Sequence, residues 1–80
     1  MSMHIQEPNT HFLVHWSYDA HHKIYGVFSS VEIAVNSINS LKNELFSAVA
    51  RQHIIDNYQI DEYKGNVLVD TIYVADVIEE

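Results

Sequence analysis

The stretch "YGVFSSVEIAVNSI", residues 25–38, decides the fold because a strand-like aromatic run changes to a helical pattern within two serines. Ser29 followed by Glu32 fits a capping box, in which the hydroxyl and the carboxylate each satisfy a free backbone N–H. Apolar residues then recur at spacings of three and four, as in an amphipathic helix. The stretch therefore predicts a corner between a strand and a helix, with Gly26 allowing the strand to bend or to approach another group closely.

Alternating residues before this corner predict a β-hairpin. In "HFLVHWSY", residues 11–18, every second side chain from Phe12 to Tyr18 falls on one face. Two-residue alternation rich in aromatic residues is typical of a strand. The segment "DAHH", residues 19–22, interrupts the pattern before "KIYGVF" resumes it. The economical interpretation is two strands joined through residues 19–22.

The helical pattern continues to about Ile55, and a second hairpin follows it. A break or kink is expected near Asn39–Asn43, where poor helix formers cluster, although an unbroken helix is the alternative. The run "YQIDEY" predicts a third strand and "VLVDTIYVADVI" a fourth. Gly65 and Asn66 between them suit a two-residue turn with a positive φ at Gly65.

These elements predict a single α+β domain over residues 11–80, preceded by a flexible N-terminal arm of residues 1–10. The order β-β-α-β-β predicts a two-layer sandwich. A four-stranded antiparallel sheet would carry one long or kinked helix on one face.

Composition narrows the possible functions. The chain of 80 residues has a net charge of -7 and no cysteine. Cations are needed to replace the counterions of phosphates, so direct nucleic-acid binding is not expected. Disulfide and thiolate chemistry are excluded. No apolar run approaches the roughly 20 residues that span a bilayer, and the N-terminus has no apolar signal core, so we expect a cytoplasmic protein without a membrane partner.

The predicted sheet has more apolar surface than one helix can cover. Its second face would expose Trp16 or a tyrosine–valine patch, depending on the register, unless a helix extension or the N-terminal arm covers it. Large exposed apolar patches usually mark interfaces. The sequence therefore predicts a protein-binding surface for a second copy, as a homodimer, or for a host protein. The candidate interface residues are Trp16, Tyr18, Tyr25, Tyr58, Tyr63 and Tyr73.

An alternative hypothesis uses the acidic second half of the chain. Carboxylates at alternating strand positions lie about 6.6 Å apart, close to the spacing of phosphates along a nucleic-acid strand. Such a surface could mimic nucleic acid and inhibit a DNA- or RNA-binding host or defence complex. The candidate acidic surface residues are Asp56, Asp61, Glu62, Asp70 and Asp76.

A metal-binding module is a second alternative. His21 and His22 lie in the predicted turn just after Asp19 and could hold a divalent ion. A third and a fourth protein ligand are not identifiable, so no metal ligand and no other cofactor is assigned. His11 and His15 would lie about 13 Å apart along a strand, which is too far for one metal.

Motifs of catalysis do not occur in the chain. It has no phosphate-binding glycine loop, nucleophile elbow or metalloprotease motif. Asp61 and Glu62 are adjacent on a predicted strand and would point to opposite faces, so they cannot act on one substrate. We therefore expect a protein that is not an enzyme and has no catalytic residues.

The segments "YGVFSS", "SINSLK" and "YQIDEY" resemble a family of short bacterial and phage proteins of unknown function. The family pattern is a strand, a G-V-F/Y-S-S corner, a helix with alanine and isoleucine, and an F/Y-x-I-x-E-Y strand. The resemblance covers residues 12–74 and implies the fold, but no activity. In size and acidity alone, the chain is also similar to phage and mobile-element proteins that bind and inhibit host machinery. This looser likeness suggests an accessory protein that binds and modulates a host protein. The matching positions are Gly26, Val27, Phe28, Ser29, Ser30, Ala34, Ile38, Tyr58, Ile60, Glu62 and Tyr63.

Overall fold

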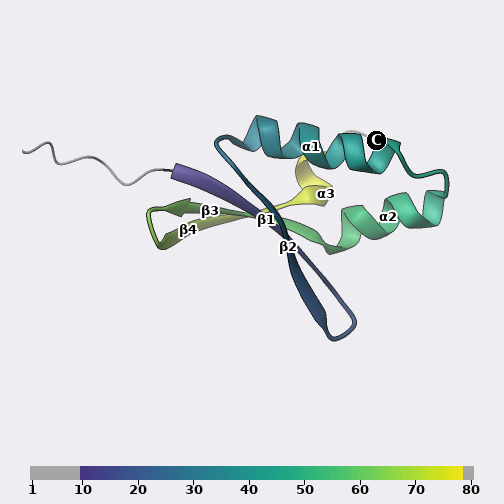
Figure 1. Ribbon diagram of the computed structural model, residues 1–80, viewed down its shortest axis with the longest axis horizontal. Coiled ribbons are helices and arrows are strands. Elements are labelled where there is room, and N and C mark those ends of the chain that lie inside the picture. The colour runs from purple at the N-terminus through teal and green to yellow at the C-terminus, as the bar shows by residue number, and fades with distance from the viewer. Residues whose placement is uncertain (1–9, 79–80) are drawn as a thin grey trace, which may run out of the picture.

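The computed structural model describes residues 10–78, which form one antiparallel sheet with helices on one side (Figure 1). The strands are β1 (Thr10–Tyr18), β2 (His21–Phe28), β3 (Tyr58–Lys64) and β4 (Val67–Tyr73), and the helices are α1 (Val31–Asn43), α2 (Ala48–Asn57) and α3 (Val74–Val77). The strand order is β2-β1-β3-β4. The predicted α+β class and four-stranded antiparallel sheet are confirmed. Of the predicted N-terminal arm, residues 1–9 lie outside the described residues, and Thr10 already belongs to β1.

The core lies between the sheet and the helices. Val14 of β1 and Ile60 of β3 are directly opposite each other in the register, and both are fully buried. The predicted alternation of β1 therefore has its physical basis in the packing of one face against the helices. The buried apolar residues are Phe12, Val14, Ala34, Ile38, Ile54, Ile60 and Val74.

The expected break in the helical segment is present and divides it into two helices, so the alternative of one unbroken helix is wrong. α1 ends at Asn43 and α2 begins at Ala48, so the break comes just after the predicted position. The Ser47 hydroxyl accepts hydrogen bonds from the backbone N–H groups of Val49 (3.2 Å) and Ala50 (3.3 Å). This cap satisfies free N–H groups at a helix start and therefore stabilises a second helix.

Two predicted element boundaries are wrong. The cap of α1 is Ser30, not Ser29, because Ser30 has extended backbone angles and its hydroxyl accepts the Ile33 N–H at 3.1 Å. β4 stops at Tyr73 instead of continuing to Ile78. The chain turns there into α3, which buries Val74 completely in the core.

The predicted positive φ at Gly65 is confirmed, with a value of 60°. The first hairpin turn is tighter than predicted, since β2 already begins at His21. Asp19 adopts a φ of 58° there, a left-handed conformation that aspartate tolerates better than most residues.

Both outer strands of the sheet contain a β-bulge. In β2, Gly26 pairs with Val14 and Ile24 pairs with His15, so Tyr25 is an extra residue. In β4, Val69 is the extra residue between the partners of Glu62 and Tyr63. A bulge bends its strand and increases the local twist.

None of the helices within residues 10–78 is both long and apolar enough to cross a membrane.

Candidate functional site

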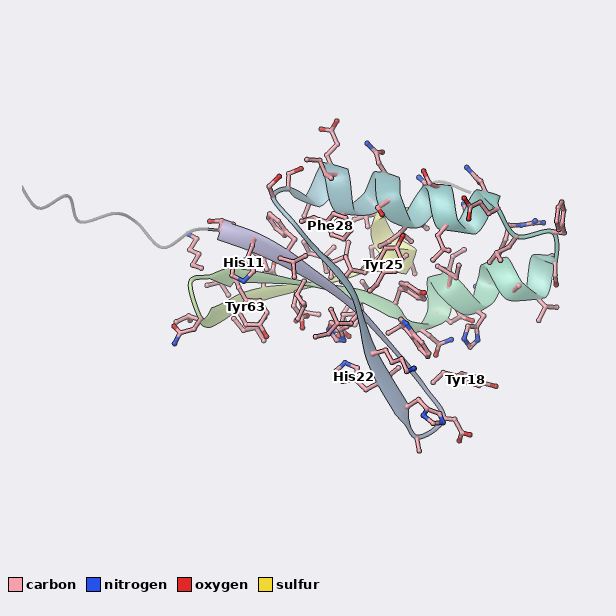
Figure 2. The ribbon with its side chains drawn as sticks, viewed as in Figure 1. His11, Tyr18, His22, Tyr25, Phe28 and Tyr63 are labelled. Carbon is pink, nitrogen blue, oxygen red and sulfur yellow. The ribbon has the colours of Figure 1, made fainter. Side chains whose placement is uncertain are left out.

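The sheet face that points away from the helices is the candidate functional site, here called the open face. Leu13 and His15 of β1 lie on this face because their neighbours Phe12 and Val14 are buried on the other. Figure 2 shows His22 and Tyr63 on this side of the sheet, while Tyr25 and Phe28 point toward α1.

The two outer strands expose apolar side chains on the open face. On β2, Val27 lies opposite Leu13 and is 59% exposed, and Ile24 lies opposite His15 and is 65% exposed. On β4, Leu68 and Tyr73 are 49% and 58% exposed. Their partners in the register are Tyr63 and Gln59 of β3, so both side chains lie on the open face.

Three polar side chains form a hydrogen-bonded line across the middle of the open face. His15 Nε2 donates to Asp61 Oδ2 at 2.8 Å, since an ionised carboxylate can only accept. The other nitrogen of the His15 ring, Nδ1, lies 2.8 Å from His22 Nε2. In a neutral His15 ring this Nδ1 accepts the N–H of His22. The line Asp61–His15–His22 thus joins β3, β1 and β2.

Asp61 is the buried end of this line. Its other oxygen, Oδ1, accepts hydrogen bonds from Gln59 Nε2 at 2.9 Å and from Thr71 Oγ1 at 3.1 Å. Burial raises the pKa of Asp61, but the hydrogen bonds from Gln59, His15 and Thr71 and the charge of His15 outweigh it, so the pKa is lowered overall. The carboxylate is therefore held in its ionised form with its oxygens satisfied.

The chemistry available to this line is limited. A carboxylate that orients an imidazole is also the arrangement of a catalytic base. Within the described chain, however, no serine or threonine hydroxyl is hydrogen-bonded to either imidazole.

A metal site is not formed by these side chains either. Asp61, His15 and His22 form a line instead of converging on one point, and no three histidine or acidic side chains among residues 10–78 could hold one metal ion. His22, a candidate of the metal hypothesis, bonds to His15 instead.

The six predicted interface aromatics do not form one surface. Tyr63 and Tyr73 lie on the open face, and Tyr63 stacks on His11 with ring centroids 5.6 Å apart. Tyr18 is 55% exposed, and its ring packs edge-on against that of His53 with the ring centroids 4.4 Å apart. The other three lie on the helix side, because the register turns that face of β1 toward the core. These residues are Trp16, Tyr25 and Tyr58.

The predicted acidic surface is also dispersed. Asp61 does not belong to it, since the residue is only 7% exposed and is hydrogen-bonded within the open face. Asp56 lies on α2 and Asp76 on α3, whereas Glu62 and Asp70 lie opposite each other on β3 and β4. These carboxylates therefore do not form the single row that mimicry of a nucleic-acid strand requires.

The interface residues predicted from the sequence did not include His15, His22 or the aliphatic residues of β2, which all belong to the open face. The alternation of β1 already placed His15 opposite the apolar side, and that signal was available. The bond from His15 to Asp61 spans 46 residues and depends on β1 lying next to β3. Local patterns carry no information on that pairing.

A comparison of the chain with family models, curated proteins and solved structures finds no match. No family assignment follows. The resemblance to short bacterial and phage proteins stays a prediction, and the functional argument depends on the geometry of the open face.

Proposed function

We propose that this chain is a non-enzymatic protein-interaction domain whose open face binds the open face of a second copy. The observation that supports the proposal is the exposed apolar surface on a sheet face that no described helix covers. Ile24, Val27, Leu68 and Tyr73 are each about half exposed or more. Exposed apolar patches of this kind are characteristic of interfaces.

The distribution of charge favours a second copy as the partner. The chain has a net charge of -7, yet the register places only one acidic residue, Asp61, on the described part of the open face, and no lysine or arginine. Asp61 is buried. Two copies could therefore meet without opposed carboxylates, whereas a basic partner would find no exposed carboxylate to pair with.

The polar line in the middle of the face is compatible with burial. Burying a polar group is costly when its hydrogen bonds are lost. Both oxygens of Asp61 and both ring nitrogens of His15 already have partners within the chain. Covering them would leave these groups satisfied.

A second copy would also enlarge a small core. A chain of 80 residues buries only about 60–65% of the surface of its unfolded state, and oligomerisation is one common remedy. Two open faces packed together would form a sandwich of two sheets, about 10 Å apart, with helices on the outside.

The test is the molar mass in solution by light scattering from micromolar to millimolar concentration. We expect a mass of twice 9.2 kDa at the upper end. Val27→Glu should weaken association by at least about tenfold, because a carboxylate would be desolvated without a partner.

Val49→Glu is the matched control, since Val49 is 80% exposed but lies on α2. Circular dichroism verifies that both variants remain folded. A wild-type chain that stays monomeric at millimolar concentration would refute the proposal, as would equal weakening by both substitutions.

A further inference from the structure

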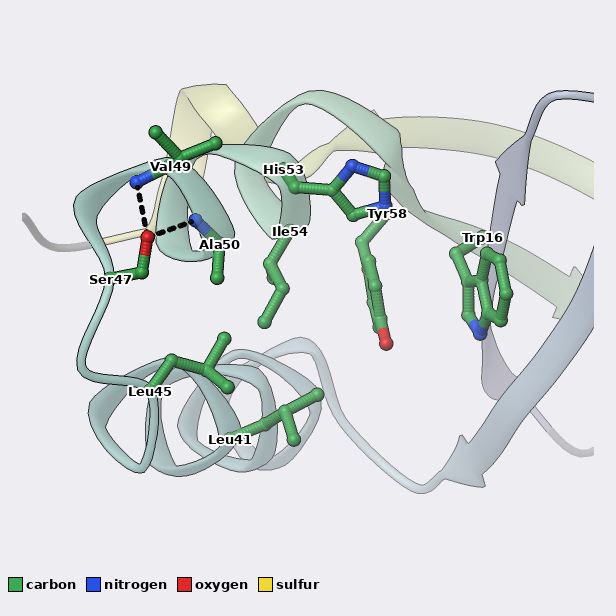
Figure 3. A pocket seen from close by; sticks show the side chains of 9 residues that line it. All are labelled: Trp16, Leu41, Leu45, Ser47, Val49, Ala50, His53, Ile54 and Tyr58. Atoms are coloured by element: carbon green, nitrogen blue, oxygen red, sulfur yellow. Dashed lines mark hydrogen bonds between the residues drawn. The ribbon is translucent and has the colours of Figure 1, made fainter.

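A pocket of about 530 Å³ lies on the helix side of the molecule, away from the open face. Its apolar floor is formed by Leu41 of α1, Leu45 of the connection between the two helices and Ile54 of α2 (Figure 3). The aromatic rings of Trp16 and Tyr58 form one wall. The volume lies within the range of about 300–1,000 Å³ that is typical of small-molecule sites.

The aromatic wall contains two hydrogen-bond donors that no acceptor among residues 10–78 engages. The rings of Trp16 and Tyr58 are nearly parallel, with centroids 6.3 Å apart and an angle of 17° between their planes. Figure 3 shows the indole nitrogen and the phenol hydroxyl at the same end of the two rings. Neither group is hydrogen-bonded to another residue of the described chain. The Ser47 hydroxyl, by contrast, is occupied by the cap of α2.

We propose that this pocket binds a small uncharged apolar molecule through a carbonyl oxygen, which accepts hydrogen bonds at the end of the wall formed by Trp16 and Tyr58. Apolar walls with a few convergent polar groups are the usual design of a ligand pocket. The inference is independent of the proposed function, because the pocket and the open face lie on opposite sides of the sheet.

The lining determines the chemical class of the ligand. His53 is the one basic side chain that lines the pocket, and no aspartate, glutamate, lysine or arginine does. A cationic ligand would therefore lose its hydration without gaining a counter-charge. The net charge of -7 disfavours anions. Burial, together with the neighbouring Tyr25, raises the pKa of Tyr58, so its phenol keeps the proton that it would donate.

Nuclear magnetic resonance can test the site directly, because Trp16 is the single tryptophan of the chain and gives one indole N–H signal. We expect acetophenone to shift this signal in a saturable way. Ethylbenzene has a similar shape but no acceptor, and it should bind about three- to tenfold more weakly. It should also leave the indole proton without the downfield shift of a hydrogen bond.

Two substitutions locate the contact. Tyr58→Phe should weaken acetophenone binding by about three- to tenfold, and Tyr73→Phe is the control on the open face. Ala50→Leu should fill the pocket and abolish binding while the amide spectrum keeps its dispersion. If Ala50→Leu unfolds the chain, the comparison of Tyr58→Phe with Tyr73→Phe still decides the question.

Three outcomes would overturn the proposal. The first is no indole shift at millimolar acetophenone, and the second is equal affinity for acetophenone and ethylbenzene. The third is an indole shift that grows with protein concentration alone and disappears in Phe46→Ala. Phe46 is 99% exposed beside the pocket, and that result would make the occupant a phenyl ring from another copy.

Discussion

Asp61 is a carboxylate that a small protein keeps buried and ionised. At 7% exposure it receives hydrogen bonds from His15, Gln59 and Thr71, whose side chains come from three different strands. Charge-assisted hydrogen bonds of this kind are stronger than neutral ones. The side chain therefore ties β1, β3 and β4 together at the centre of the open face.

Acid should destabilise the fold partly through this residue. The pKa of Asp61 is lowered in the folded state, so the unfolded chain takes up the proton first as the pH falls. The contribution of Asp61 to stability is present above about pH 4, the ordinary value for aspartate, and is lost as the pH falls through the lowered pKa. Urea unfolding between about pH 3 and pH 7 should therefore show a shallower loss of stability for Asp61→Asn than for the wild type.

Asp76→Asn is the control for this experiment, because it removes an exposed carboxylate on α3. Wild-type acid sensitivity is expected for this variant. If Asp61→Asn and the wild type lost stability in parallel over this range, the assigned role of Asp61 would be wrong.

At the scale of elements, two serine caps determine where the helices begin. Ser30 follows β2 directly and caps α1, and Ser47 caps α2 after the break at residues 44–47. The second cap allows the chain to fold back into a pair of helices. The two helices create the pocket, since side chains of both contribute to its lining.

Adjacent serines make the first cap easy to test. Ser30→Ala should lower the free energy of unfolding by about 1 kcal/mol, because the Ile33 N–H loses its acceptor. Ser29→Ala, one residue earlier, should change it by no more than about 0.5 kcal/mol. Denaturant titration of both variants checks the assignment, and a larger loss for Ser29→Ala would favour the cap that the sequence alone predicts.

At the scale of the whole molecule, dimerisation has to overcome the repulsion between two copies of like charge. Each copy contributes a net charge of -7, and the exposed carboxylates Asp56, Asp70 and Asp76 lie on α2, β4 and α3. Long-range repulsion between copies is screened by salt, whereas apolar contact depends little on it. Association through the open face should therefore respond to salt in a definite direction.

Raising the ionic strength from about 0.05 M to 0.5 M should strengthen dimerisation by a few-fold, because the Debye length becomes shorter than the separation of most charges. Sedimentation equilibrium at several salt concentrations measures this directly. Weaker association at high salt would contradict the proposed contact and would indicate attraction between opposite charges.

Local patterns predicted the sheet well and the site poorly, for a physical reason. The alternation through Phe12 and Val14 and the turn at Gly65 depend on neighbours in sequence, and the structure has both. The pairing of β1 with β3 depends on how two hairpins meet across the helices. Asp61, His15 and His22 come together only through that pairing, so no local pattern could predict their line of hydrogen bonds.

The bulges in β2 and β4 have a consequence for the fate of this protein at high concentration. Endless fibres grow when a straight, unpaired strand accepts the next chain along its backbone. In this molecule each edge strand contains one extra residue that has no partner in the neighbouring strand, Tyr25 in β2 and Val69 in β4. The irregular backbone interrupts such strand pairing at both edges of the sheet. At high concentration the protein should therefore form a finite assembly and no amyloid fibres.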